Sequence, residues 1–167
     1  MKVMKFGGTS VGSAARIKDV AGLITGYGKN VIVLSAMSGT TNSLVEISDY
    51  LYNRNAYGAR DVIDRLAARY DSHIEELYET EEYRNRASEY VHGIFDYLKT
   101  FTKQLYTQVE EKIILAQGEL MSTHMMTFYL EEKGVDVMLV PALDFMRIDN
   151  QGEPEQDYIG GHLDAIM

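Results

Sequence analysis

The sequence predicts an α/β fold, and three observations lead to that prediction. A short apolar start at residues 2–6 is followed by the adjacent glycines Gly7 and Gly8 and then by a helical pattern. A second apolar run at residues 31–34 is rich in β-branched side chains, which is typical of a strand buried on both faces. Because a helical pattern separates these two strands, we expect them to pair in parallel through a right-handed crossover.

The helix between the two strands has a clear start, face and end. Ser13 is suited to be its N-cap. Apolar residues then recur with i, i+3, i+4, i+7 spacing, as on one face of an amphipathic helix: Ile17, Val20, Ala21 and Ile24. The Gly-Tyr-Gly segment at 26–28 should end the helix.

Residues 43–112 contain no convincing strand pattern. Apolar residues in this stretch follow helical spacing, and we expect several helices packed as a bundle inserted into the α/β frame. Breaks are expected at Gly58 and at residues 79–82. The arginines of this segment alternate with acidic residues, which favours solvated helix faces.

After the bundle, the pattern returns to alternating element types. We expect a long helix over residues 113–133, a third core strand over 136–140 and a short edge strand over 145–148. A turn at 150–152 and a helix from Tyr158 to Met167 complete the prediction.

Composition excludes several classes of protein. The chain has 167 residues, a net charge of −9 and no cysteine, so we expect neither a nucleic-acid partner nor thiol chemistry. No apolar stretch approaches the roughly 20 residues that span a bilayer, and we expect a cytoplasmic protein with no membrane partner. The histidines at 73, 92, 124 and 162 lack the spacing of metal ligands, so no protein ligand for a metal is expected.

The glycine turn after the first strand is the strongest candidate site. Adjacent glycines allow a ligand to approach the backbone, helix N-termini attract phosphates, and Lys5 adds a mobile positive charge. A tight turn with a solvated lysine is the structural alternative. The whole string K-F-G-G-T-S-V, residues 5–11, resembles the opening signature of aspartate kinases in the amino-acid kinase superfamily.

Two further segments resemble the same family. The string V-L-S-A-M-S-G-T-T-N, residues 33–42, is similar to a family loop at the carboxyl end of a strand, where open α/β sheets bind ligands. Gly118, Glu119 and Ser122 match a G-E-x-x-S pattern of the family. From its apolar flanks we expect Glu119 to be partly buried and to need a partner, with a structural ion pair as the alternative to a substrate role. A weaker match begins at Asp144, where we expect Arg147 to make a structural pair.

The resemblance implies a fold, a reaction and a set of roles. The fold is a mainly parallel sheet between helical layers, and the reaction moves the γ-phosphoryl of ATP onto the β-carboxylate of L-aspartate, the first step towards lysine, threonine and methionine. Lys5 would be catalytic and Mg²⁺ would be held mainly by phosphates. The implied phosphate-binding residues are Lys5, Gly7, Gly8, Thr9, Ser10, Ser35, Ala36 and Gly39, and the implied substrate-binding residues are Thr41 and Glu119.

The resemblance also implies an incomplete site. A second glycine-rich segment of the form G-R-G-G-S-D is absent, as are the adenine-binding half and the ACT regulatory domains. We therefore expect residues 1–167 to be one partial catalytic domain, with 43–112 as a helical insertion, from a monofunctional aspartate kinase or one fused to homoserine dehydrogenase. Alone, this chain is expected to be weakly active or inactive.

Two alternatives remain open at this stage. The chain could belong to a kinase for another small acid, such as glutamate or acetylglutamate. It could instead be a non-enzymatic binding or assembly module that associates through its helical bundle. We expect the protein to be a homo-oligomer whose substrates are small molecules.

Overall fold

A computed structural model describes residues 2–26 and 28–166. Tyr27, part of the segment predicted to end the first helix, lies outside the described residues. The chain divides into two compact units, Met1–Val137 and Met138–Met167. The first unit contains the sheet, the helical bundle and all the matched segments from residue 5 to residue 122, so it is the unit that concerns the site.

The predicted β-α-β start is confirmed. Strands β1 (Lys2–Phe6) and β2 (Asn30–Leu34) pair in parallel, with Lys2 opposite Asn30 and Phe6 opposite Leu34. Helix α1 (Ala14–Thr25) connects them, and the Ser13 side chain accepts a hydrogen bond from the Arg16 N–H at 3.3 Å, as expected of an N-cap. The apolar residues predicted to lie on one face of α1 are all buried, as their helical spacing predicts: Ile17, Val20, Ala21 and Ile24.

The prediction that residues 31–34 are buried on both faces is wrong for this chain. Leu34 is 7% exposed, whereas its neighbour Val33 is 43% exposed and Val3 on β1 is 70% exposed. Successive side chains of a strand point to opposite faces. The described sheet is therefore covered on the face of Leu34 and open on the face of Val3 and Val33.

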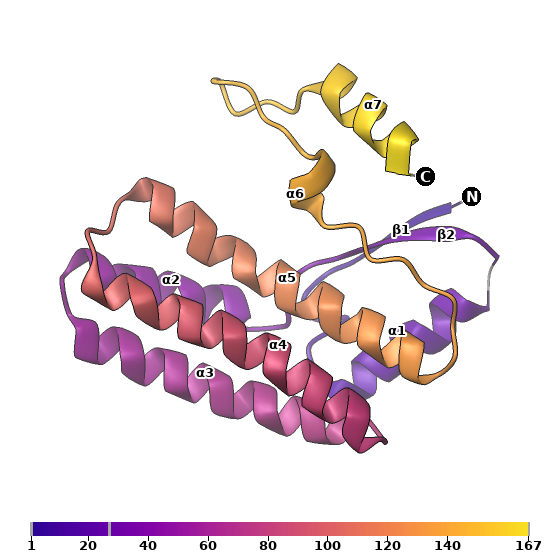
Figure 1. The fold of residues 1–167 in the computed structure, drawn as a ribbon, viewed down its shortest axis with the longest axis horizontal. Coiled ribbons are helices and arrows are strands. Elements are labelled where there is room, and N and C mark those ends of the chain that lie inside the picture. Colours follow the sequence, from indigo (N-terminus) through magenta and orange to yellow (C-terminus); the bar gives the residue numbers. More distant parts are fainter. Residues whose placement is uncertain (1, 27, 167) are drawn as a thin grey trace. The chain divides into compact units, whose positions relative to one another are not determined.

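The helices that follow β2 in the first unit form a bundle beside the sheet, as Figure 1 shows. They are α2 (Thr40–Tyr52), α3 (Ala56–Leu77), α4 (Glu81–Thr100) and α5 (Gln108–Glu132). Each packs against the next, and α5 returns to α2, while α1 packs against α3 and α5. A short 3-10 turn, η1 (Phe101–Lys103), follows α4.

The helical prediction for the bundle is confirmed, with small shifts at the breaks. Gly58 lies in the first turn of α3 rather than between helices, and its amide is capped by Asn55 at 2.9 Å. Asn55 ends the preceding turn, so the capping side chain and not the glycine marks the boundary. The break expected at residues 79–82 lies at 78–80, and α4 begins at Glu81.

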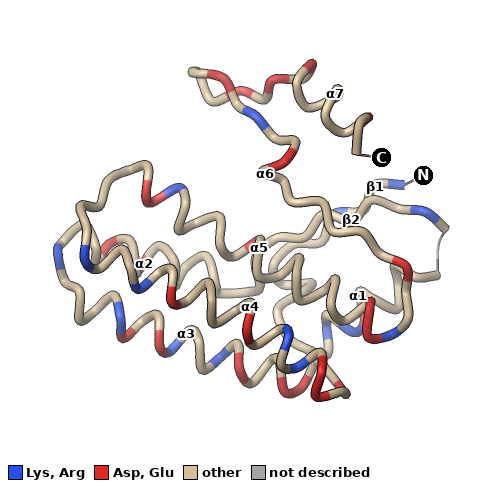
Figure 2. Tube along the Cα trace, in the orientation of Figure 1, with Lys and Arg blue, Asp and Glu red and all other residues tan. Residues whose placement is uncertain are grey.

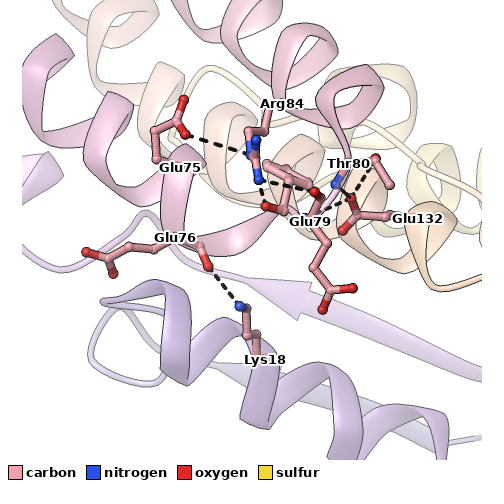
Figure 3. A network of polar contacts seen from close by, with 8 residues as sticks. Lys18, Glu75, Glu76, Glu79, Thr80, Arg84 and Glu132 are labelled. Carbon is pink, nitrogen blue, oxygen red and sulfur yellow. Dashed lines mark hydrogen bonds and ion pairs between the residues drawn. The ribbon is translucent and has the colours of Figure 1, made fainter.

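The turn between α3 and α4 is held by a polar network drawn in Figure 3. Glu132, at the end of α5, accepts hydrogen bonds from the Glu79 and Thr80 amides at 3.0 and 2.8 Å and from the Thr80 hydroxyl at 2.8 Å. Lys18 of α1 donates to the Glu76 carbonyl at 2.8 Å. Helices α1 and α5 are thereby both tied to this corner of the bundle.

Charged residues alternate in sign along α3 and α4, which Figure 2 shows as blue and red segments. Several form exposed pairs of the kind expected from the sequence, such as Arg65 with Asp61 at 3.2 Å and Lys99 with Asp64 at 2.9 Å. These pairs contribute little to stability, roughly 0.2 to 1 kcal/mol each. No helix among residues 2–26 and 28–166 is both long and apolar enough to cross a membrane.

The second unit differs from the prediction. Residues 136–140, expected to be a third core strand, have no strand hydrogen bonding and span the boundary between the two units. Residues 142–145 form a short helix, α6 (Ala142–Phe145), and an isolated antiparallel bridge joins Ile148 to Pro154 where an edge strand was expected. The turn at 150–152 is confirmed, with Gly152 at φ +87°, and so is the last helix, α7 (Gln156–Ile166).

Candidate functional site

The site lies where the two parallel strands end. Parallel strands bring their carboxyl ends to the same edge of a sheet. The Ser35 amide donates a hydrogen bond to the Phe6 carbonyl at 3.1 Å, so the loop after β2 starts beside the glycine turn after β1. A Cβ added at Gly8 would lie 2.7 Å from the Ala36 carbonyl oxygen, so only glycine fits at this contact.

The glycine turn itself is closely organised. The Ser10 amide donates to the Gly7 carbonyl at 2.9 Å, so this amide is not a free phosphate donor. The Arg16 guanidinium donates to the Thr9 carbonyl. A Cβ added at Gly12 would lie 2.9 Å from the Ser38 Cβ, a second close contact between the turn and the loop.

Helix α5 packs against the loop that follows β2. A Cβ at Gly118 would meet the Ala36 Cβ at 2.7 Å, so the glycine inside this helix is explained by close approach of the loop. The Ser122 hydroxyl donates to the Ser35 carbonyl at 2.8 Å. The Glu119 carboxylate accepts a hydrogen bond from the Ala36 amide at 3.2 Å. All three residues of the G-E-x-x-S pattern therefore contact residues 35 and 36.

The partial burial expected for Glu119 is wrong, whereas the expected partner is present. Its side chain is exposed rather than partly buried, because it lies on the face of α5 that looks towards the loop and solvent. Its partner is a backbone amide, and the structure records no ion pair for it among the described residues. One carboxylate oxygen is thus fixed by the loop, which leaves acceptor capacity for a ligand.

Lys5 and Thr41 are both exposed. Lys5 lies at the penultimate position of β1, opposite Val33 on the open face of the sheet. Within the described part of the chain no hydrogen bond or ion pair engages its ammonium group. Thr41 lies in the first turn of α2, which begins earlier than expected, at Thr40.

Sequence reasoning missed a cluster behind the loop. Gly39 has φ +78°, and a Cβ there would lie 2.9 Å from Nη1 of Arg69 on α3. Nη2 of Arg69 donates to the Thr40 hydroxyl at 3.0 Å, and that hydroxyl lies 3.0 Å from the Tyr70 hydroxyl. Arg69 has no acid at i±3 or i±4, unlike Arg65, and this was the available signal that it does not belong to a solvated charge ladder.

Burial raises the pKa of Tyr70 to about 12, although the Thr40 hydrogen bond opposes the shift. Thr40 and Tyr70 are both fully buried at 0% exposure. Burial also lowers the pKa of His73, one turn further along α3, and the nearby Arg69 charge adds to this effect. The Arg69 side chain is itself half-buried, so it lies at the edge of this buried region and not in open solvent.

No group of three or more His, Cys, Asp or Glu side chains that could hold a metal ion occurs among the described residues. The chain has a cavity of about 440 Å³ elsewhere, lined by residues of α2, η1 and the segment after it, including Leu51, Tyr52, Phe101 and Tyr106. It lies at the opposite end of α2 from the loop. We therefore place the candidate site at the loops and not at this cavity.

Comparison with known proteins agrees with this geometry. The chain matches the amino acid kinase family over residues 1–159. The chain therefore belongs to the amino acid kinase family. It is 32% identical over 136 residues to aspartokinase 2 of Arabidopsis thaliana, covering 79% of this chain and 25% of that protein. It is 34% identical over 137 residues to aspartokinase 1 of the same plant, covering 80% and 24%.

Solved structures share the fold. Aspartokinase III of E. coli, crystallised with aspartate and ADP, superposes with a TM-score of 0.77 at 23% identity, over 99% of this chain and 37% of that one. The aspartate kinase of Clostridium acetobutylicum gives a TM-score of 0.76 at 18% identity, over 98% and 36%. The chain spans about a quarter of the length of the curated relatives named above.

Proposed function

We propose that this chain provides the phosphoryl-transfer and amino-acid side of an aspartate kinase, which transfers the γ-phosphoryl of ATP to the β-carboxylate of L-aspartate. The product is 4-phospho-L-aspartate, which leads towards lysine, threonine and methionine. One observation carries the proposal. Three separate segments that resemble aspartate kinases meet at Ala36, through Gly8, Gly118 and Glu119.

The proposed chemistry needs positioning and charge rather than a nucleophile on the protein, since the substrate carboxylate attacks the phosphoryl group. Lys5 neutralises charge on that group, and the turn at residues 7–10 supports the phosphates. Ser35, Ala36 and Gly39 lie beside them. ATP is the co-substrate, and Mg²⁺ is held mainly by its phosphates.

In this proposal the protein binds the two charged groups of the amino acid separately. The α-ammonium group binds the exposed Glu119 carboxylate, which the Ala36 amide fixes in place. The α-carboxylate binds at the start of α2 through Thr41. We further propose that residues 43–112 form a helical insertion within the catalytic domain, and that the working enzyme is a cytoplasmic homo-oligomer.

A hydroxylamine-trapping assay with Mg-ATP and L-aspartate tests the function, on this chain and on the longest protein that its gene encodes. We expect turnover in the longer protein and a loss of about 100-fold or more in Lys5→Ala, because transition-state charge loses its counter-ion. Lys29→Ala is the matched control, since Lys29 is also exposed but precedes β2 at the other end of the sheet.

Two results would favour the alternatives. Hydroxamate formed from glutamate or N-acetylglutamate, and not from aspartate, would assign another acidic substrate to the same site. A tight oligomer in light scattering that binds neither ATP nor aspartate would support an assembly module instead.

A further inference from the structure

Arg69 stands out because it is half-buried and has no carboxylate partner among the described residues. Arg65, Arg86 and Lys99 of the bundle pair with Glu46, Glu131 and Asp64. The bundle cations that form no such pair, Arg54, Arg60, Lys103 and Lys112, are exposed, so water screens their charge. The described residues offer Arg69 no carboxylate, and its recorded hydrogen bond goes to a threonine hydroxyl. A half-buried guanidinium without a counter-ion is unfavourable for folding alone.

The position of Arg69 at the start of α2 makes its lack of a counter-ion more unfavourable. Gly39 is the N-cap of α2 and supplies no side-chain cap, and the first turn of α2 contains no acidic residue. A helix N-terminus carries positive partial charge, which anions stabilise and cations do not. The Arg69 guanidinium lies against this same end, since its Nη1 is 2.9 Å from the Cβ position of residue 39.

Arg69 also fixes the shape of the loop. The left-handed φ of Gly39, +78°, disfavours any side chain at position 39, and a Cβ there would also push the Arg69 guanidinium away from the turn. Arg69 holds the Thr40 hydroxyl from one side, and the buried Tyr70 hydroxyl contacts it from another. Thr40 Cγ2 lies 3.3 Å from the Cβ position of Gly118, the residue before Glu119.

We propose that Arg69 is a positioning residue that holds the Gly39–Thr40 turn for the acidic amino acid and supplies positive charge to the end that receives its carboxylate. This inference rests on the proposed function. The loop then has a carboxylate at one end, Glu119 on the Ala36 amide, and a guanidinium at the other, Arg69 on Gly39 and Thr40. That order of charges suits a zwitterionic amino acid. It also gives the helical segment a part in shaping the substrate site, through the turn that Arg69 holds.

The kinetic test uses the longest protein that the gene encodes. We expect Arg69→Gln to raise KM for L-aspartate about tenfold, with kcat and KM for ATP changed less than about twofold, because the carboxylate end of the site loses both its positive charge and the hydrogen bond that holds Thr40. Arg69→Lys, which keeps the charge and one donor, should recover most of the affinity. Thr40→Val should raise the same KM and show strong non-additivity with Arg69→Gln.

Arg65→Gln is the matched control. Arg65 lies one turn before Arg69 on the same helix and also connects α3 to α2, through Glu46 at 3.5 Å. It should leave KM for aspartate unchanged. An equal rise in Arg65→Gln, an equal rise in KM for ATP, or no rise in Arg69→Gln would overturn the proposal.

A second measurement does not depend on the enzyme activity. The Thr40 amide donates to the Met37 carbonyl at 2.9 Å and the Ser43 amide to the Gly39 carbonyl at 3.1 Å. In this 167-residue chain without ligand, Arg69→Gln should speed hydrogen exchange of these two amides about tenfold, as local opening becomes easier, and Arg65→Gln should not.

The two measurements separate the two hypotheses. If neither the chain nor the longer protein uses aspartate, the proposed function fails and the substrate role of Arg69 fails with it. The exchange rates would still decide whether Arg69 holds the turn, and unchanged rates would overturn that part as well.

Discussion

At the scale of single residues, Gly118 shows how closely α5 and the loop are packed. We expect Gly118→Ala to destabilise the chain by about 1 to 3 kcal/mol, because the new Cβ would lie 2.7 Å from the Ala36 Cβ and neither atom belongs to a flexible side chain. Urea unfolding followed by circular dichroism measures this. Glu119 should also lose its hold on the Ala36 amide.

Gly93→Ala provides the control for helix propensity. Gly93 is exposed in the middle of α4, and a Cβ there would have no neighbour within 4 Å. It should stabilise the chain by about 0.5 to 1 kcal/mol, the ordinary gain of alanine over glycine in a helix. Similar effects at both positions would show that the contact at Ala36 is loose.

Tyr70 makes stability depend on alkaline pH. Its pKa is raised from 10.0 to about 12, so the folded state holds the proton more tightly than the unfolded state. The resulting contribution is present in full below pH 10 and is lost as the pH rises towards 12. Over that interval Tyr70 should account for about 2 kcal/mol of lost stability.

Tyr70→Phe isolates this contribution, since it removes the titrating group while the ring remains. Urea midpoints between pH 8 and 12 should fall less steeply in the variant than in the parent. At pH 8 the variant should be weaker by only about 0.5 to 1.5 kcal/mol, because the Thr40 hydroxyl retains Arg69 as a partner. Parallel pH profiles for the two proteins would contradict the shift.

The sequence predicted the close contact at Gly118 correctly, but it did not predict how exposed Glu119 is. The glycine in the long helix was expected to mark close approach, and the structure confirms this with Ala36. The exposure of Glu119 and the contact of Arg69 with the Gly39–Thr40 turn could not be predicted, because both depend on which face of one helix meets another segment more than 25 positions away. Helical periodicity gives the faces of a helix but does not identify its neighbours.

At the scale of elements, the α3–α4 turn depends on a carboxylate from α5. Thr80, the N-cap of α4, makes no capping bond with its own side chain, and Glu132 accepts from its amide instead (Figure 3). We expect Glu132→Ala to cost about 1 to 3 kcal/mol in unfolding free energy, because two backbone amides lose their acceptor. Glu75→Ala should cost less than about 1 kcal/mol, since its 3.8 Å pair with Arg84 is exposed. Equal costs would mean that the network acts only through surface charge.

At the same scale, the local sequence was enough to predict the helices, but it was not enough to predict which segments pair into the sheet. Periodicity, caps and turn residues were enough for α1 and the helices of the bundle, since these signals act within a few residues. The third strand at residues 136–140 has an apolar strand-like composition, yet a strand exists only where another strand pairs with it. Val33 is exposed for a related reason, as no described layer of the first unit covers that face of the sheet.

At the scale of the whole molecule, the core belongs to the first unit. The buried hydrophobic residues run from Val11 to Leu130, and none of the described residues 138–166 is buried. We therefore expect a chain ending at Val137 to unfold cooperatively with a midpoint within about 3 °C of the parent, since stability follows buried apolar area.

A chain ending at Tyr106 is the contrasting case. It lacks α5, whose Ile114, Met121 and Met125 are all 0% exposed in the core that joins α1, α2 and α4. It should lose the cooperative transition and its near-ultraviolet circular dichroism.

The chain ending at Val137 also tests the site. It retains Gly8, Ala36, Arg69 and Glu119, so it should bind L-aspartate as the parent does. A large loss of stability or of binding in that chain would show that residues 138–167 complete the core or the site.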